Sequence, residues 1–296
     1  MAENSSSPET PDEGAGPRAA ADPAPAPPPP SVWESLTGFR GTTSRRTDVY
    51  VGIAGFAFLL ILWSMATTFG WVGPSFLASI PEVIGRLYGM FAGENVGHSF
   101  AWDIAISIYR VGAAFLLSAV MAIPLGILMS SYRIVNGLSE PIVDFIRYLP
   151  VPALVPLTVI WLGIGETSKI ALLWIGTFFQ LVLLIADDAR RVPREYIEIG
   201  MTVGAKPRSV LRHIILPAML PNMVDNLRIT LGWCWTYLIV AEIVAANSGI
   251  GYVIMASRRY GAVDTIFAGI LTIGVIGLAT DQAIRWFHRR YFAYLR

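Results

Sequence analysis

Long apolar runs separated by shorter polar stretches dominate the chain from residue 49 onwards. A helix that spans a membrane needs about 20 mostly apolar residues. We expect one transmembrane helix in each of six runs, at residues 49–68, 104–129, 142–164, 168–187, 221–245 and 266–286. The pattern therefore predicts an all-α, polytopic membrane protein with about six transmembrane helices. Between the first two runs, residues 71–103 form a mixed connection in which we expect one helix at 81–91.

Prolines and glycines interrupt two of these runs. Pro124 and Gly126 lie in the second run and are expected to interrupt its helix, and Pro150, Pro152 and Pro156 break the start of the third. A proline lacks the backbone N–H that a helix needs, and irregular backbone at membrane depth requires protein or a water-filled cavity around it. We therefore expect the stretch around Pro150 and Pro152 to border a translocation path.

Polar and aromatic side chains on the later runs are further candidates for the lining of this path. They are Thr177, Gln180, Trp233, Thr236 and Glu242. The alternative for each of them is ordinary contact between helices, because small and hydroxylated residues commonly mediate such contacts in membranes.

The first 47 residues differ in composition from the rest. Residues 1–30 consist mainly of Ala, Pro, Ser and Gly with acidic residues, which cannot bury enough apolar surface to fold. Residues 31–41 show a short amphipathic pattern that is compatible with lying on a membrane surface. We accordingly divide the chain into a disordered, Pro/Ala-rich tail at 1–47 and a transmembrane domain at 48–296.

The charged residues indicate the orientation of the domain. Only 15% of the residues are charged and the net charge is +1, which gives no indication of nucleic-acid binding. Sixteen Lys and Arg residues fall in segments that face the cytoplasm if the N-terminus does, against four in the segments of the other side. By the positive-inside rule, both termini and residues 186–217 are predicted to be cytoplasmic, in a protein of the plasma membrane.

Four ionisable residues lie within or near the apolar runs: Arg110, Arg228, Glu242 and Asp281. A charge in mid-membrane costs about 2.5–3.5 kcal/mol on insertion scales, so each needs a partner or a function. We expect Arg258 or Arg259 to pair with Glu242, and Arg285 to pair with Asp281. The three His residues are far apart, and we expect neither a metal site nor a catalytic site in this chain.

The polar segment Glu198–Pro217, EIGMTVGAKPRSVLRHIILP, carries the strongest local signals. Residues 194–203 favour a helix, which Gly204 is able to end in the left-handed conformation. Pro207 suits the first position of a second helix, whose apolar face comprises residues 210, 211, 214 and 215. We expect Pro217 to end this second helix before the fifth span. The prediction is a helix–turn–helix with Glu198 on its first helix.

The spacing of Glu198, Gly204 and Ile214-x-Leu216-Pro217 resembles the EAA motif of type I ABC-importer permeases, a loop that docks onto the ATP-hydrolysing subunit. From about residue 107 to 286 the chain is similar to permeases of the nitrate, taurine and aliphatic-sulfonate importer family. The segments that carry this similarity are SIYRVGAAF (107–115), IPLGILM (123–129), PIVDFIRYLPVPALVPLTVIWLGIGETSKI (141–170) and AEIVAANSGIGYVI (241–254). As a departure, the core of the motif reads Glu198-Ile199-Gly200 where the family usually has small residues after the Glu.

The resemblance implies a type I ABC-importer permease fold and a coupling loop at 190–217. Its coupling residues would be Glu198, Gly204, Ala205, Arg208, Ile214, Leu216 and Pro217. It also implies four kinds of partner: cytoplasmic ABC ATPase subunits that bind ATP and Mg, a second permease copy forming a homodimer, an extracytoplasmic solute-binding protein, and a small anion such as nitrate, taurine or a sulfonate. The chain itself would hold no cofactor. The alternative is an ion-coupled secondary transporter, which predicts repeated halves with paired acids, and the sequence has no such repeat.

Overall fold

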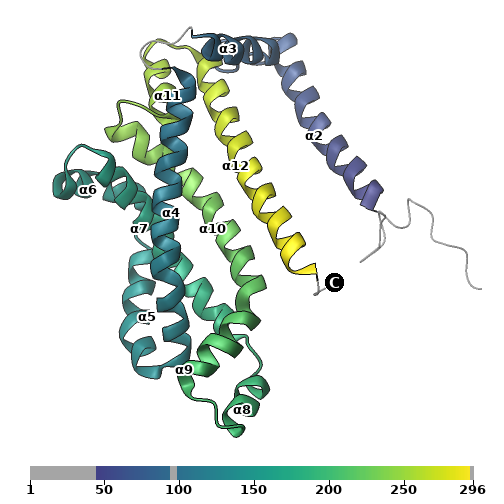
Figure 1. The fold of residues 1–296 in the computed structure, drawn as a ribbon. Helices are drawn as coiled ribbons and strands as arrows, with labels where there is room; N and C mark the ends of the chain where they lie inside the picture. Colours follow the sequence, from purple (N-terminus) through teal and green to yellow (C-terminus); the bar gives the residue numbers. More distant parts are fainter. Residues whose placement is uncertain (1–44, 94–98, 294–296) are drawn as a thin grey trace, which may run out of the picture. The chain divides into compact units, whose positions relative to one another are not determined.

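The computed structural model describes residues 45–93 and 99–293, in which every regular element is helical (Figure 1). Most of the predicted tail at 1–47, with its amphipathic segment at 31–41, lies outside these residues, and its last three residues, 45–47, belong to the first helix. The elements follow the chain in the order α2 (Arg45–Thr68), α3 (Ile80–Ala92), α4 (Phe100–Ser131), α5 (Arg133–Arg147), η1 (Val151–Leu154), α6 (Val155–Leu162), α7 (Glu166–Arg190), α8 (Arg194–Thr202), α9 (Pro207–Val210), η2 (Leu211–Ile215), α10 (Leu216–Ala245), α11 (Ile250–Arg259) and α12 (Val263–Tyr291).

Several of these helices are suited to crossing a membrane. Within the described residues, α2, α4, α7 and α12 are each long and apolar enough to do so, and α5 with the following η1–α6 segment makes a fifth if this bent pair is one span. The 30-residue α10 occupies the fifth predicted run and is more polar, since it contains Arg228 and Glu242. The predicted all-α, polytopic fold with about six membrane helices is therefore confirmed.

The second span is not interrupted, contrary to the prediction. Helix α4 runs through Pro124 without a break over 32 residues. Prolines are tolerated inside membrane helices because neighbouring groups satisfy the backbone that they free. Close packing explains the glycine at position 126. A Cβ atom there would lie 2.8 Å from Cβ of Ile185 and from the Val182 carbonyl oxygen on α7. Gly126 thus allows α4 and α7 to approach closely.

The third span is irregular, as its prolines predict. Helix α5 ends at Arg147, a short 3₁₀ segment follows at Val151–Leu154, and α6 continues at an angle of 92° to α5. Pro152 and Pro156 each lie in the first turn of the element that follows the break. At such a position the missing N–H needs no partner within the helix.

The chain divides into two compact units, residues 1–60 and 61–296, and everything described below belongs to the second. Its centre is formed by α4, α7 and α10. Two apolar clusters join these helices along their length, and their innermost side chains are fully buried: Ala114, Ala122, Leu173, Leu181, Ile185 and Leu238.

A third apolar cluster joins α3, the start of α4, α11 and α12. The helix predicted at 81–91 is α3, which begins with a capping box in which Glu82 accepts a hydrogen bond from the Ser79 backbone N–H at 2.8 Å. This bond stabilises the carboxylate and lowers the pKa of Glu82. Arg86 on α3 donates to Thr265 Oγ1 on α12 at 2.8 Å, so α3 is held by α12.

Candidate functional sites

The predicted helix–turn–helix is present between α7 and α10. Helix α8 ends at Thr202, and Gly204 follows in the left-handed conformation with φ 85°. The Gly204 N–H donates to the Met201 carbonyl oxygen, and the Ala205 N–H donates to that of Gly200. These two bonds are those of a Schellman motif, which closes a helix and turns the chain. Gly204 and Ala205 therefore determine the orientation of α8 relative to the second helix.

Gly200, which sequence reasoning treated only as a departure from the motif, is the contact point between α8 and the second helix. It is buried, and a Cβ atom there would lie 2.5 Å from Cδ1 of Ile214. Close packing of the two helices therefore depends on the absence of a side chain at this position. The signal was available in the sequence, since Gly is a poor helix former and its presence inside a helix usually has a packing reason.

Pro217 does not end the second helix, which corrects the prediction. Every residue from Pro207 to Ala245 is helical: α9 leads into the π segment η2, and η2 leads into α10. Leu216 and Pro217 are the first two residues of α10, where a proline is tolerated because the wider π turn before it has already shifted the hydrogen-bonding pattern. The second helix of the loop and the fifth span are thus one continuous helix.

Helix α8 exposes apolar side chains beside acidic ones. Tyr196, Ile199 and Val203 are spaced i, i+3 and i+7, and each is more than half exposed. Ile199 contributes to two shallow hollows, one of which also includes Glu198. Arg208 is exposed on α9. Such spacing of exposed apolar residues is typical of a helix that lies in the groove of a partner.

The proline-broken segment borders a pocket of about 250 Å³ between α5, η1, α7 and α10. Of the candidate path residues, Pro150, Pro152, Gln180 and Trp233 line this pocket. Tyr237 also lines it, and its ring lies where a Cβ atom on Gly176 would come within 2.7 Å. The Gly176 position thus leaves room for the Tyr237 ring at the pocket wall.

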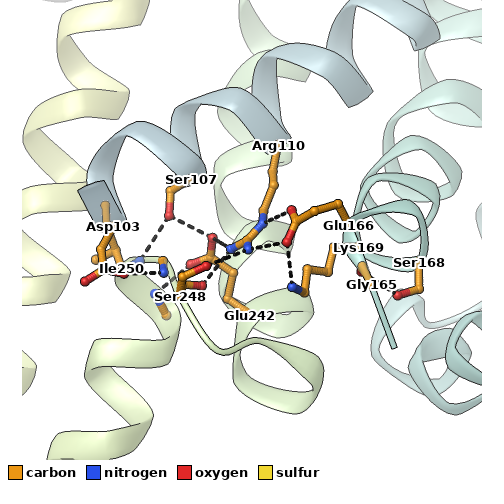
Figure 2. A network of polar contacts seen from close by, with 12 residues as sticks. Asp103, Ser107, Arg110, Gly165, Glu166, Ser168, Lys169, Glu242, Ser248 and Ile250 are labelled. Atoms are coloured by element: carbon orange, nitrogen blue, oxygen red, sulfur yellow. Dashed lines mark hydrogen bonds and ion pairs between the residues drawn. The ribbon is translucent and has the colours of Figure 1, made fainter. Parts of the chain in front are cut away.

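The remaining path candidates lie elsewhere. Thr177 is fully buried and its hydroxyl lies 2.7 Å from that of Ser118, which links α7 to α4. Thr236 is exposed and donates to the carbonyl oxygen of Trp233. Glu242 is buried at the end of α10 that lies away from the helix–turn–helix, in a polar network centred on Arg110 (Figure 2).

Arg110 on α4 uses all of its five N–H donors. Its Nε and Nη2 donate to the two carboxylate oxygens of Glu166 at 2.6 and 2.7 Å. Its Nη1 donates to Glu242 Oε1 at 2.6 Å and to the Ser248 carbonyl oxygen at 2.8 Å, and Nη2 also donates to Ser248 Oγ at 3.2 Å. Lys169 completes the group by donating to Glu166 Oε1 at 2.9 Å. Arg110 thus joins α4 to the starts or ends of α7, α10 and α11.

Glu242 pairs with Arg110 and not with Arg258 or Arg259, so the predicted partner was wrong. The correct partner is 132 residues away in the sequence, whereas the sequence argument considered cations on the nearby connection. Both side chains of the pair are completely buried. The other predicted pair is confirmed, with Arg285 2.9 Å from Asp281, and Arg228 lies 3.6 Å from the same carboxylate.

The network also anchors the start of α11. Three successive backbone N–H groups donate to side chains: Gly249 to Asp103, Ile250 to Ser107 and Gly251 to Glu242, at 2.7 to 3.0 Å. Carboxylates at this position complement the positive end of a helix dipole. Gly249 has φ 110°, and a Cβ atom there would overlap Glu242, so no side chain fits between them. This part of the network is closed on all sides.

Sequence reasoning noted Arg110 and Glu242 but missed the network. Asp103, Ser107 and Arg110 are spaced i, i+4 and i+7, which puts them on one face of α4. That polar stripe in an otherwise apolar helix was a readable signal, and two of its members belong to the segment 107–115 quoted above. Its partners, in contrast, come from two distant parts of the chain, at residues 166 and 242–250.

Comparisons with known proteins show the family to which the chain belongs. Residues 122–293 match the family of binding-protein-dependent transport system inner membrane components. The chain is 32% identical to the taurine transport system permease protein of Escherichia coli, over 85% of this chain and 91% of that protein. It is 31% identical to a putative aliphatic sulfonates transport permease protein of Bacillus subtilis, over 79% of this chain and 83% of that protein.

Solved structures support the fold. A crystal structure of an amino acid ABC transporter matches with a TM-score of 0.56 at 16% identity, covering 70% of this chain and 96% of that chain. Family membership also removes the alternative of an ion-coupled transporter that works without an ATPase. The chain belongs to the binding-protein-dependent transport system inner membrane components and is a permease subunit of an ABC importer.

Proposed function

We propose that this permease imports a small oxyanion, with a sulfonate as its preferred head group, and that a cytoplasmic ATPase drives it by docking on α8. The substrate class is supported by two relatives named for taurine and aliphatic sulfonates, both of which carry a sulfonate group. The docking role is supported by the exposed apolar face of α8, with Glu198 beside it. This exposed face is the observation that carries the proposal.

In this proposal Glu198 meets a basic group of the ATPase, while Gly204 and Ala205 hold the turn that presents it. Arg208 lies on the exposed side of α9 and contacts the partner as well. Ile214 supports α8 from behind through Gly200, and Leu216 and Pro217 continue directly into α10. Force applied to the loop therefore has a route into the membrane domain.

We further propose that two copies of this chain assemble, that a solute-binding protein delivers the anion from outside, and that both chain termini are cytoplasmic. The charge bias of sixteen against four supports this orientation. The anion would pass the pocket bordered by Pro150, Pro152, Gln180 and Trp233, which lies midway along α7 and α10. Polar groups at such depth are costly unless they serve a path or find partners.

The orientation is testable with single cysteines in a Cys234→Ser background, because Cys234 is buried and its removal leaves no other thiol. Cysteines at Ser75 and Asn247 should react with an impermeant reagent added to intact cells, and one at Ser209 should not. Labelling of Ser209 from outside would reverse the orientation and exclude cytoplasmic docking on this loop.

Transport itself is tested in proteoliposomes that contain the chain, its ATPase and its binding protein. We expect ATP-dependent, vanadate-sensitive uptake of a labelled alkanesulfonate that is lost without the ATPase. Uptake of an uncharged analogue at the same rate would refute the oxyanion class, and uptake without ATP would refute the coupling.

A further inference from the structure

Glu166 is the most exposed of the four charged side chains that are paired around Arg110. Its side chain is 41% exposed, whereas those of Arg110, Lys169 and Glu242 are between 0% and 6% exposed. Glu166 is also the first residue of α7 and follows Gly163 and Gly165, which form the turn after α6. Gly249 and Gly251, in contrast, pack directly against the carboxylate of Glu242.

Arg110 and Lys169 bind the Glu166 carboxylate in the way that proteins bind a free oxyanion. Two nitrogens on one edge of the Arg110 guanidinium donate to its two oxygens at 2.6 and 2.7 Å, and Lys169 adds a third donor at 2.9 Å (Figure 2). Bidentate binding by an arginine edge is a common mode of recognition for carboxylates and other oxyanions. The positive end of the α7 dipole adds to the attraction.

The charges in the network explain why this position would accept a second anion. The side chains paired directly with one another around Arg110 carry two positive charges, on Arg110 and Lys169, and two negative charges, on Glu166 and Glu242. The third carboxylate of the network, that of Asp103, accepts from the Gly249 N–H at the start of α11. Glu242 neutralises the inner edge of the guanidinium and remains there. If the Glu166 side chain swings outward, one positive charge is left over in a poorly solvated position, which is unfavourable until another anion replaces the carboxylate.

We propose that the Nε and Nη2 edge of Arg110, together with Lys169 Nζ, is a binding site for the head group of a small monovalent oxyanion, a sulfonate in particular. Glu166 fills this site when no ligand is bound and is displaced by the ligand. The site lies at the end of α7 and α10 opposite to α8, so under the proposed orientation it is an entry site for the imported anion. The choice of a sulfonate and the role as an entry site both rest on the proposed function, whereas the oxyanion site itself does not.

The experiment measures binding of methanesulfonate to the purified assembly of this chain and its ATPase, without ATP. The readout is the thermal unfolding midpoint, titrated with sodium methanesulfonate and, in parallel, with sodium chloride at equal ionic strength. In Glu166→Ala the site is vacant, and we expect a saturable rise that chloride does not reproduce. In the wild type, if Glu166 occupies the site for about nine-tenths of the time, the apparent affinity should be about tenfold weaker.

Two further variants test whether methanesulfonate raises the unfolding midpoint by binding at Arg110 and Lys169. Adding Lys169→Gln to Glu166→Ala should abolish the methanesulfonate response while the fold is retained, because Arg110 and Glu242 remain paired. Glu242→Ala should give no response, because Gly249 and Gly251 close that side of Arg110. The proposed site would be refuted if chloride raised the unfolding midpoint of the Glu166→Ala assembly as much as methanesulfonate does. It would also be refuted if methanesulfonate raised this midpoint no more than that of the wild type.

Uptake is measured separately on the wild-type assembly, which keeps the two proposals apart. Sulfonate uptake by an assembly whose Glu166→Ala variant does not bind methanesulfonate would refute this site and leave the importer function standing. Binding by Glu166→Ala, with a wild type that transports no sulfonate, would support the site and refute the proposed substrate.

Discussion

Charged residues are exposed near one end of α7 and α10 and buried near the other. At the end next to α8, Glu198 and Arg208 point to the surface beside exposed apolar side chains. At the other end, Arg110 and Glu242 are completely buried and bonded to each other. The first end leaves its charged and apolar side chains exposed, and the second holds segments of this chain together. A substitution should therefore have different consequences at the two ends.

The largest effect is expected from Arg110→Ala. Removing one member of a buried pair leaves Glu242 charged and unpaired, which costs about 3–5 kcal/mol. We expect low abundance in the membrane and a lower unfolding midpoint for what remains. Arg259→Ala is the matched control, since Arg259 is exposed at the end of α11 and its loss should leave abundance unchanged. Equal abundance of the two variants would show that the network is not needed for stability.

A smaller effect is expected from Gly200→Val at the other end. The added side chain would overlap Ile214, and overpacking of this kind costs about 1–3 kcal/mol. Because α8 has few other contacts, the strain should move α8 and leave the membrane helices folded. Combining it with Ile214→Ala should restore ATPase binding, measured by copurification. Without such rescue, the contact between Gly200 and Ile214 would not be what positions α8.

Gly204→Val should disturb coupling with still less effect on stability. A β-branched residue in the left-handed conformation costs roughly 1–2 kcal/mol, which is enough to change the turn. The variant should insert normally but lose substrate-stimulated ATP hydrolysis in proteoliposomes. Gly112→Val is a suitable control, because a Cβ atom there meets nothing within 4 Å. Wild-type uptake and hydrolysis by Gly204→Val would exclude this turn as the coupling element.

The smallest effect is expected from Glu198→Ala. Glu198 is exposed, and an ion pair that water can reach is worth about 1 kcal/mol at most. Coupling should weaken several-fold and respond to ionic strength in the wild type more than in the variant. Complete loss of hydrolysis would mean that Glu198 is buried at the interface with its partner, which would strengthen the comparison of the two ends.

Local chemistry explains which features could be predicted from the sequence. The left-handed Gly204, the start of α9 at Pro207 and the break around Pro150 depend on the residues themselves and their immediate neighbours. The rule that proline ends a helix failed at Pro124, through which α4 continues, and at Pro217, where a π segment leads directly into α10. Glu242 was given the wrong partner because its real one comes from a distant helix, and sequence distance carries no information about that contact.

The chain is helical without a break from the start of α9 to the end of α10. Arg191, Val192 and Pro193 are not helical and separate α7 from α8, whereas every residue from Pro207 to Ala245 is helical, through α9, η2 and α10. Its 30 residues make a rod about 45 Å long, and a tilt of about 5° carries the far end roughly 4 Å. A displacement of that size exceeds the tolerance of the hydrogen bonds at Glu242. A tilt of α10 as one body would therefore require α4 and the start of α11 to move with it, because both are bonded to Glu242.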